Sequence, residues 1–225
     1  MSQESGDKNL KFGFFINTTF VVLEFIAGLA ANSLALISDA VHNLTDSMSI
    51  GFSFLASKFA KRGASEYQTF GYGRAAILAA TINATVLVVT ATLIYREAWT
   101  RLSNPQPVEG KVVAIIALVG IISNSTVAWF AARSRKDLNA RVVFLSNLVD
   151  IVSSTLALIA GLLIIFTRQT WIDPAISFVI ATMLLIAAWQ ILREATRVLM
   201  EGVPKGIDAA KVKAAITKHP GVTGV

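Results

Sequence analysis

The sequence contains no cysteine, only two histidines and few charged residues. The absence of cysteine excludes disulfide bonds, thiolate metal sites, iron–sulfur clusters and cysteine nucleophiles. Charged side chains make up 15% of the 225 residues, whereas an ordinary soluble domain carries about 25%. Hydrophobic residues make up 54%, and the mean hydropathy is +0.63. This composition predicts a membrane protein. The net charge of +6 needs no nucleic acid partner, because cytoplasmic loops of membrane proteins are rich in Lys and Arg.

Six apolar runs are long enough to cross a bilayer as helices, which takes about 20 residues each. They are Phe12–Ala31, Leu34–Phe59, Ala75–Trp99, Val112–Ala132, Val142–Phe166 and Trp171–Leu192, the last continuing toward Met200. Asp173-Pro174 is typical of an N-cap followed by a proline in the first helical turn. The sequence therefore predicts an all-α, polytopic membrane protein. Its expected parts are an N-terminal tail (1–11), a six-helix transmembrane domain (12–202) and a C-terminal segment (203–225).

The basic residues are distributed unevenly between the two ends of these spans. With the N-terminus in the cytoplasm, 16 of the 20 Lys and Arg residues fall on the inner side. Because cytoplasmic loops carry the excess of Lys and Arg, both termini are predicted to be cytoplasmic. In the segment after the sixth span, Ile207, Val212 and Ile216 have helical spacing. A single helix cannot bury a core, so residues 207–225 are expected to be mobile.

Four acidic residues and one histidine are predicted to lie at bilayer depth, where a charge costs at least about 2.5–3.5 kcal/mol. They are Glu24, Asp39, His42, Asp46 and Asp150. Asp39, His42 and Asp46 are spaced i, i+3 and i+7, which places them on one stripe of the second span. Asp150 lies at matching depth in the antiparallel fifth span, and Ser146 precedes it by one helical turn. An imidazole and carboxylates that converge there predict a site for a divalent first-row metal ion, zinc above all.

Each of these residues also has a purely structural interpretation. His42 alone could be a hydrogen-bonded histidine between helices, and Asp46 alone could be a polar packing contact. Asp39 could line an exit path or simply make hydrogen bonds. Glu24 could stay protonated and donate to a neighbour.

The segment from Ala31 to Asp46, with the sequence ANSLALISDAVHNLTD, closely resembles the second-span signature of the cation diffusion facilitator family. The similarity covers essentially the whole chain and includes Phe70-Gly71-Tyr72-Gly73-Arg74, the loop 104–110, Leu138-Asn139-Ala140-Arg141 and the segment 199–204. The resemblance implies a proton-coupled exporter of zinc or a similar divalent cation, usually a homodimer. It also implies a transport site built from one His/Asp-x-x-x-Asp pair on the second span and another on the fifth.

His42 and Asp46 match the first pair, but the second pair is incomplete. Asp150 fits its aspartate, whereas Ser146 stands where the family has His or Asp, with Asn147 beside it. The serine hydroxyl or a water would then complete a zinc site, and manganese or another oxygen-preferring ion becomes more plausible as cargo. The family's small cytosolic α/β domain, which helps the protein dimerise, is expected here only as an opening stub at 203–225.

These observations predict an alternating-access antiporter. The metal ligands would be His42, Asp46, Asp150 and Ser146, with Asp39 and Glu24 along an ion or proton pathway. Zinc or another divalent cation is the expected substrate, and no cofactor is expected. The expected partners are protons, the lipid bilayer and a second copy of the chain. The expected location is a bacterial inner membrane.

The alternative function is that of a non-transporting partner subunit or scaffold for a complete relative. An enzyme is not expected, because the sequence has no His-Glu-x-x-His motif, no evident Ser/His/Asp set and no Gly-rich phosphate loop.

Overall fold

The structure, a computed structural model, describes residues 18–60, 69, 71–133, 138–203, 206–219 and 221–222. Within these ranges the chain forms helices and no strands, which confirms the all-α prediction. The helices are Thr18–Ala30, α2 (Leu34–Ala60), α3 (Ala75–Ser103), α4 (Gly110–Arg133), α5 (Leu138–Thr167), α6 (Ile172–Leu199) and α7 (Ala209–Ile216).

The helices correspond to the predicted spans with small shifts at their ends. By length and composition, α3, α4, α5 and α6 can each cross a membrane. α2 is long enough as well, but it carries the polar residues of the predicted site. Residues 12–17 of the first predicted span and the tail 1–11 lie outside the described residues. The presence of six crossings and the cytoplasmic position of both termini stay predictions.

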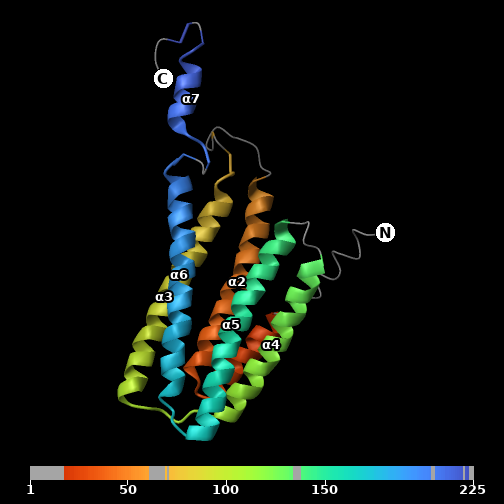
Figure 1. Cartoon of the computed structure of the whole chain (residues 1–225), viewed down its shortest axis with the longest axis vertical. Coiled ribbons are helices and arrows are strands. Elements are labelled where there is room, and N and C mark those ends of the chain that lie inside the picture. The colour runs from red at the N-terminus through yellow and green to blue at the C-terminus, as the bar shows by residue number, and fades with distance from the viewer. Residues whose placement is uncertain are drawn as a thin grey trace.

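The long helices run side by side in an elongated bundle, and α7 projects from one end of it (Figure 1). Two helix pairs dominate the packing, α3 with α6 and α4 with α5. α2 contacts α3, α5 and α6, so it touches both pairs. This arrangement places α2 against α5, the two helices that carry the predicted metal ligands.

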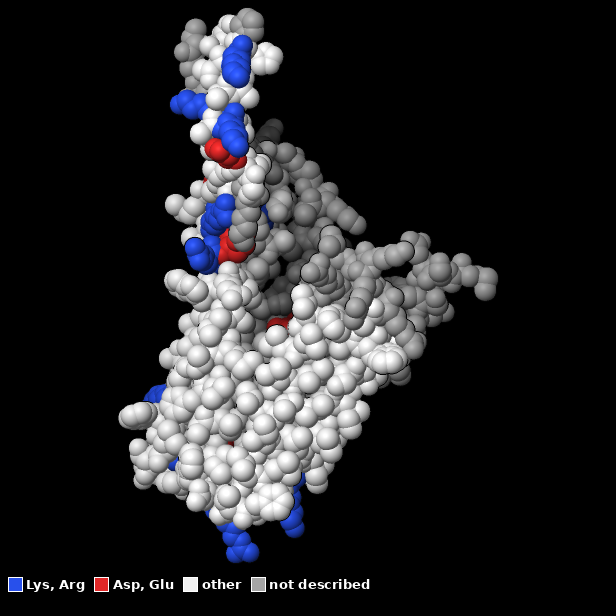
Figure 2. Space-filling view, in the orientation of Figure 1, with Lys and Arg blue, Asp and Glu red and all other residues white. Residues whose placement is uncertain are grey.

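The outer surface of the bundle is apolar. Figure 2 shows a broad zone with few Lys, Arg, Asp or Glu side chains between charged ends. Many large apolar side chains of the helices are exposed, among them Leu93, Ile115, Phe130, Ile186 and Trp189. Such a belt is typical of helices that face lipid, because apolar side chains there replace the polar surface of a soluble protein.

α4 and α5 approach each other closely at two glycines. A Cβ added to Gly161 would lie 2.7 Å from the backbone nitrogen of Ala114, and one on Gly110 would lie 2.9 Å from the carbonyl oxygen of Gly161. Small residues permit such backbone contact between helices in a membrane. The absence of side chains at these positions therefore accounts for the tight α4–α5 pair.

Asp173 caps a different helix from the one predicted. It lies inside the first turn of α6, whose N-cap residue is Trp171. Its Oδ2 accepts a hydrogen bond from the backbone N–H of Leu34 at 2.7 Å, and its Oδ1 accepts from Ser33 Oγ at 2.5 Å and from the N–H of Ala35 at 3.3 Å. The first N–H groups of a helix have no partners within that helix. Asp173 thus caps α2 and fixes its start against α6.

The turn between the first helix and α2 is also held from α3 and the following loop. Asn32 adopts a left-handed backbone conformation, with φ of 52°. Its carbonyl oxygen accepts from Arg101 Nη1 at 2.7 Å, and its Nδ2 donates to the carbonyl of Pro107 at 3.0 Å. The N–H of Glu109 donates to the carbonyl of Ala31 at 3.1 Å. Together with the cap from Asp173 of α6, these bonds hold the start of α2 against α3, α6 and the loop after α3.

The opposite end of the bundle carries an exposed ion pair, in which Arg74 Nη2 lies 2.6 Å from Glu201 Oε1. It links the start of α3 to the end of α6. Beyond it, Asp208 caps α7 by accepting from the N–H groups of Ala210 and Lys211. The predicted tail helix is confirmed, and its residues are solvent-exposed.

Candidate metal centre

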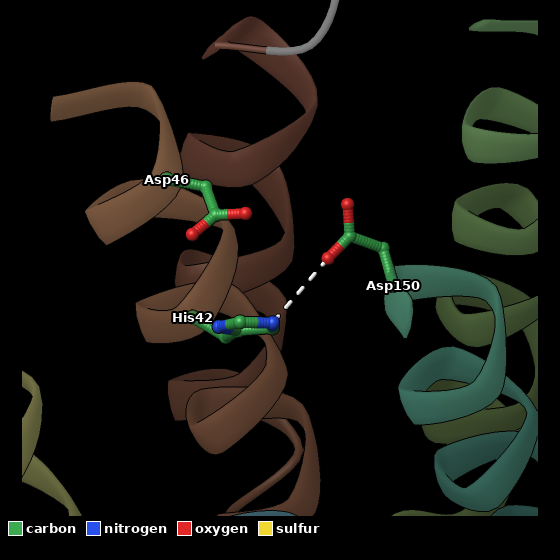
Figure 3. A group of neighbouring side chains, drawn as sticks. All are labelled: His42, Asp46 and Asp150. Atoms are coloured by element: carbon green, nitrogen blue, oxygen red, sulfur yellow. Dashed lines mark ion pairs between the residues drawn. The ribbon is translucent and has the colours of Figure 1, made fainter. Parts of the chain in front are cut away.

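The structure brings His42 and Asp46 of α2 together with Asp150 of α5, which lies far from them in the sequence (Figure 3). One ligand atom from each lies within 4.8 Å of the other two. His42 Nε2 is 3.5 Å from Asp150 Oδ1. His42 and Asp46 share a face because residues at i and i+4 are neighbours on a helix. The α2–α5 contact then brings Asp150 to the same level.

These groups are removed from solvent. His42 is 7% exposed and Asp150 is 6% exposed, while Asp46 is partly buried. His42 Nδ1 and Asp150 Oδ1 have no hydrogen-bond partner among the described residues. A buried polar atom without a partner costs about 1–3 kcal/mol. A cation bound between His42 Nε2 and the carboxylates would give Asp150 Oδ1 a partner and remove its share of this cost.

Ser146 also lies at this centre, and its side chain points to Asp46. Its Oγ donates to Asp46 Oδ2 at 2.6 Å, across from α5 to α2. Asn147, the other residue considered for the fourth position, donates from Nδ2 to the carbonyl of Val143 on its own helix at 2.8 Å. The side chain that reaches the cluster is therefore that of Ser146, one helical turn before Asp150.

The comparisons with known proteins identify the family of the chain. Residues 10–200 match the family described as the cation efflux transmembrane domain. The chain belongs to the cation efflux family. The resemblance to the cation diffusion facilitators is thereby confirmed, and the family is one of membrane transporters.

Curated relatives of this cation efflux domain are similar over nearly its whole length. The cadmium, cobalt and zinc/H(+)-K(+) antiporter of Bacillus velezensis is 36% identical over 98% of this chain and 72% of its own length. Zinc transporter ZitB of Escherichia coli K12 is 36% identical over 95% of this chain and 69% of its own. Metal cation efflux system protein CzcD of Cupriavidus metallidurans is 35% identical over 96% and 69%.

A second polar group lies next to the metal ligands, toward the start of α2. Asp39 and Glu24 are both 0% exposed. Ser154 Oγ of α5 donates to Asp39 Oδ2 at 2.7 Å, and Asn43 Nδ2 of α2 donates to Glu24 Oε2 at 3.1 Å. Asn43 follows Asp39 by one turn of α2, so its hydrogen bond to Glu24 brings the two carboxyls near each other. Three helices of this cation efflux domain therefore contribute to one buried polar cluster.

Sequence reasoning found the two carboxyls of this cluster but missed both of their donors. Asn43 follows His42 directly, and Ser154 lies one turn after Asp150. Their positions beside predicted ligands were the available signal.

Proposed function

We propose that this cation efflux domain exports a divalent metal ion, zinc in the first place, in exchange for protons. The observation that supports the proposal best is the convergence of His42, Asp46 and Asp150 within 4.8 Å in a chain of the cation efflux family. The names of the relatives, which include zinc, cadmium and cobalt, point to the same class of substrate.

One imidazole and two carboxylates form a donor set suited to zinc. In tetrahedral zinc sites the Zn–N and Zn–O distances are about 2.0–2.2 Å, which places neighbouring ligand atoms roughly 3.3 Å apart. The three ligand atoms are separated by as much as 4.8 Å. Binding would therefore draw the side chains inward by up to about 1.5 Å, and a water or Ser146 Oγ would provide the fourth ligand.

Proton exchange follows from the chemistry of the ligands. Imidazole and carboxylate bind a metal ion in their deprotonated forms, so protons compete with the metal for the same site. In our proposal His42, Asp46 and Asp150 take the ion from the cytoplasm. The bundle then exposes the site to the other side, where protons displace the ion. Glu24 and Asp39 lie toward that side and would line the pathway.

The setting of the protein is part of the proposal. The positive-inside distribution supports six crossings with both termini in the cytoplasm. The relatives above come from bacteria, which supports placement in the bacterial inner membrane. We propose a homodimer as the functional assembly.

The test is zinc flux in proteoliposomes that contain the purified protein alone and a zinc-sensitive dye. An imposed pH gradient should drive zinc movement in the opposite direction to protons. Asp150→Asn should abolish the flux, and the matched carboxyl-to-amide control Glu109→Gln, at an exposed loop position, should not. If zinc causes no proton movement, antiport is wrong. If the protein alone moves no metal but stabilises a co-expressed relative, the partner-subunit alternative is correct.

A further inference from the structure

Glu24 and Asp39 each have one buried carboxyl oxygen without a hydrogen-bond donor among the described residues. Each carboxyl has one oxygen with a donor, Glu24 Oε2 with Asn43 and Asp39 Oδ2 with Ser154. The remaining oxygens, Glu24 Oε1 and Asp39 Oδ1, are buried and have no hydrogen-bond partner among the described residues. An ionised carboxylate can only accept, so neither group can satisfy the other while both are charged.

Two ionised carboxylates that are fully buried and near each other are also electrostatically unfavourable. Like charges at this range prevent both groups from ionising together, and an unpaired buried charge is costly. In the described part of the chain, no Lys or Arg forms an ion pair with either carboxyl. The other ionisable groups that act on the pair are His42 on α2 and Asp150 on α5. Neither hydrogen-bonds to Glu24 or Asp39. α4 carries charged residues only at its ends.

We propose that Glu24 and Asp39 form a second cation-binding site, which holds one proton between Glu24 Oε1 and Asp39 Oδ1. This proton supplies the missing donor and leaves the pair with a single negative charge. The site is separate from the metal centre, because Glu24 and Asp39 are not among the residues His42, Asp46 and Asp150 that form that centre.

The same two helices connect the proton site to the metal centre. Asp39 lies one turn before His42 on α2, and its donor Ser154 lies one turn after Asp150 on α5. A divalent ion bound at the metal centre therefore repels a proton held one turn away, in a region where charges are poorly screened. When the domain binds a metal ion in the function proposed above, this proton is released. The domain would then exchange about one proton more per metal ion than the metal ligands alone provide.

Two variants mimic the protonated pair and keep the size of the side chains. Glu24→Gln places an amide donor against Asp39, and Asp39→Asn places one against Glu24. Each replaces the shared proton by an N–H group, so both variants should fold. Glu109→Gln, an exposed carboxyl-to-amide change, is the matched control.

Infrared spectroscopy of the metal-free protein at neutral pH tests the site itself. The wild type and Glu109→Gln should show the C=O stretching band of a protonated carboxyl, and both pair variants should lose that band. A band of unchanged intensity in Glu24→Gln and Asp39→Asn, or no such band in the wild type, would overturn the proposal. This result does not depend on metal binding, so it is separate from the success or failure of the proposed function.

Calorimetric titration with zinc in two buffers of different ionisation enthalpy tests the coupling. The wild type should release about one proton more per zinc than Glu24→Gln. Equal release in both proteins would refute the coupling. A wild type that binds no zinc, yet shows the infrared band, would refute the proposed function and leave the proton site standing.

Discussion

Replacing Ser146 by histidine should tighten zinc binding. In the structure Ser146 Oγ lies 2.6 Å from Asp46 Oδ2, so the side chain at this position points into the metal centre. A serine hydroxyl is a poor zinc ligand, whereas an imidazole nitrogen is a good one. Ser146→His therefore offers a fourth strong ligand beside His42, Asp46 and Asp150.

The size of the effect follows from two opposing changes. The substitution removes the hydrogen bond to Asp46, which is worth about 1.5–3 kcal/mol when the acceptor is charged. The bound metal neutralises that carboxylate, so little of this loss persists in the zinc complex. Loss of outer partners of metal ligands shifts affinity by about 10–100-fold, and a direct ligand should contribute at least as much. We expect zinc affinity to rise at least tenfold in Ser146→His, about 1.4 kcal/mol, with weaker tolerance for manganese.

The assay is competition for zinc against a fluorescent chelator, with detergent-solubilised protein. Ser146→Ala is the matched control, because it removes the donor to Asp46 without adding a ligand. It should bind zinc more weakly than the wild type. If Ser146→His and Ser146→Ala both bind zinc as the wild type does, Ser146 does not act on the ion and the reasoning is wrong. Tighter binding need not increase export, because a tightly held ion leaves slowly.

Three further predictions concern the ligands, the cap of α2 and the tail. Asp46→Ala and Asp150→Ala should each abolish zinc binding. Circular dichroism should still show an intact helical bundle, because removing a charge inside the membrane removes an energetic cost. Normal zinc binding by either variant would mean that the site lies elsewhere. Asp173→Asn sets an amide N–H against the donors at the start of α2, so the free energy of unfolding should fall by about 1.5–3 kcal/mol. The unfolding temperature in detergent should therefore be lower. The control Asp208→Asn, at the cap of the exposed α7, should leave this temperature unchanged. Amide hydrogens of residues 207–219 should exchange within the fastest phase of a deuterium-exchange experiment, because the tail helix is exposed, and strong protection there would indicate a docking partner.

Much of the fold could be predicted because apolar length alone determines where a helix can cross a bilayer. The ends of the helices were less certain, since helix ends depend on local hydrogen bonds. Asp173 illustrates the reason. An aspartate before a proline has the composition of an N-cap, but its carboxylate caps α2, which starts 139 residues earlier at Leu34. No local pattern distinguishes a cap on the same helix from a cap on a neighbouring one.

The candidate site was predictable where spacing within one helix decides the geometry. His42 and Asp46 are four residues apart, so they share a face of any helix that contains them. The position of Ser154 one turn after Asp150 was a signal, but it did not reveal the partner of its hydroxyl, because a serine in a membrane helix has two common partners. Ser38 donates to the carbonyl of Leu34 in its own helix, whereas Ser154 donates to Asp39 on another helix. Only the packing of α2 against α5 selects between these outcomes.

X-ray absorption at the zinc edge, measured on the purified zinc-loaded protein, tests the central claim most directly. The chain has no cysteine and only two histidines, His42 and His219, so any imidazole ligand comes from one of them. The account predicts nitrogen and oxygen ligands at about 2.0–2.2 Å with the scattering pattern of one imidazole. That pattern should disappear in His42→Ala and persist in His219→Ala. An imidazole signal that survives His42→Ala and is lost in His219→Ala would show that the ion binds the tail and not the α2–α5 centre.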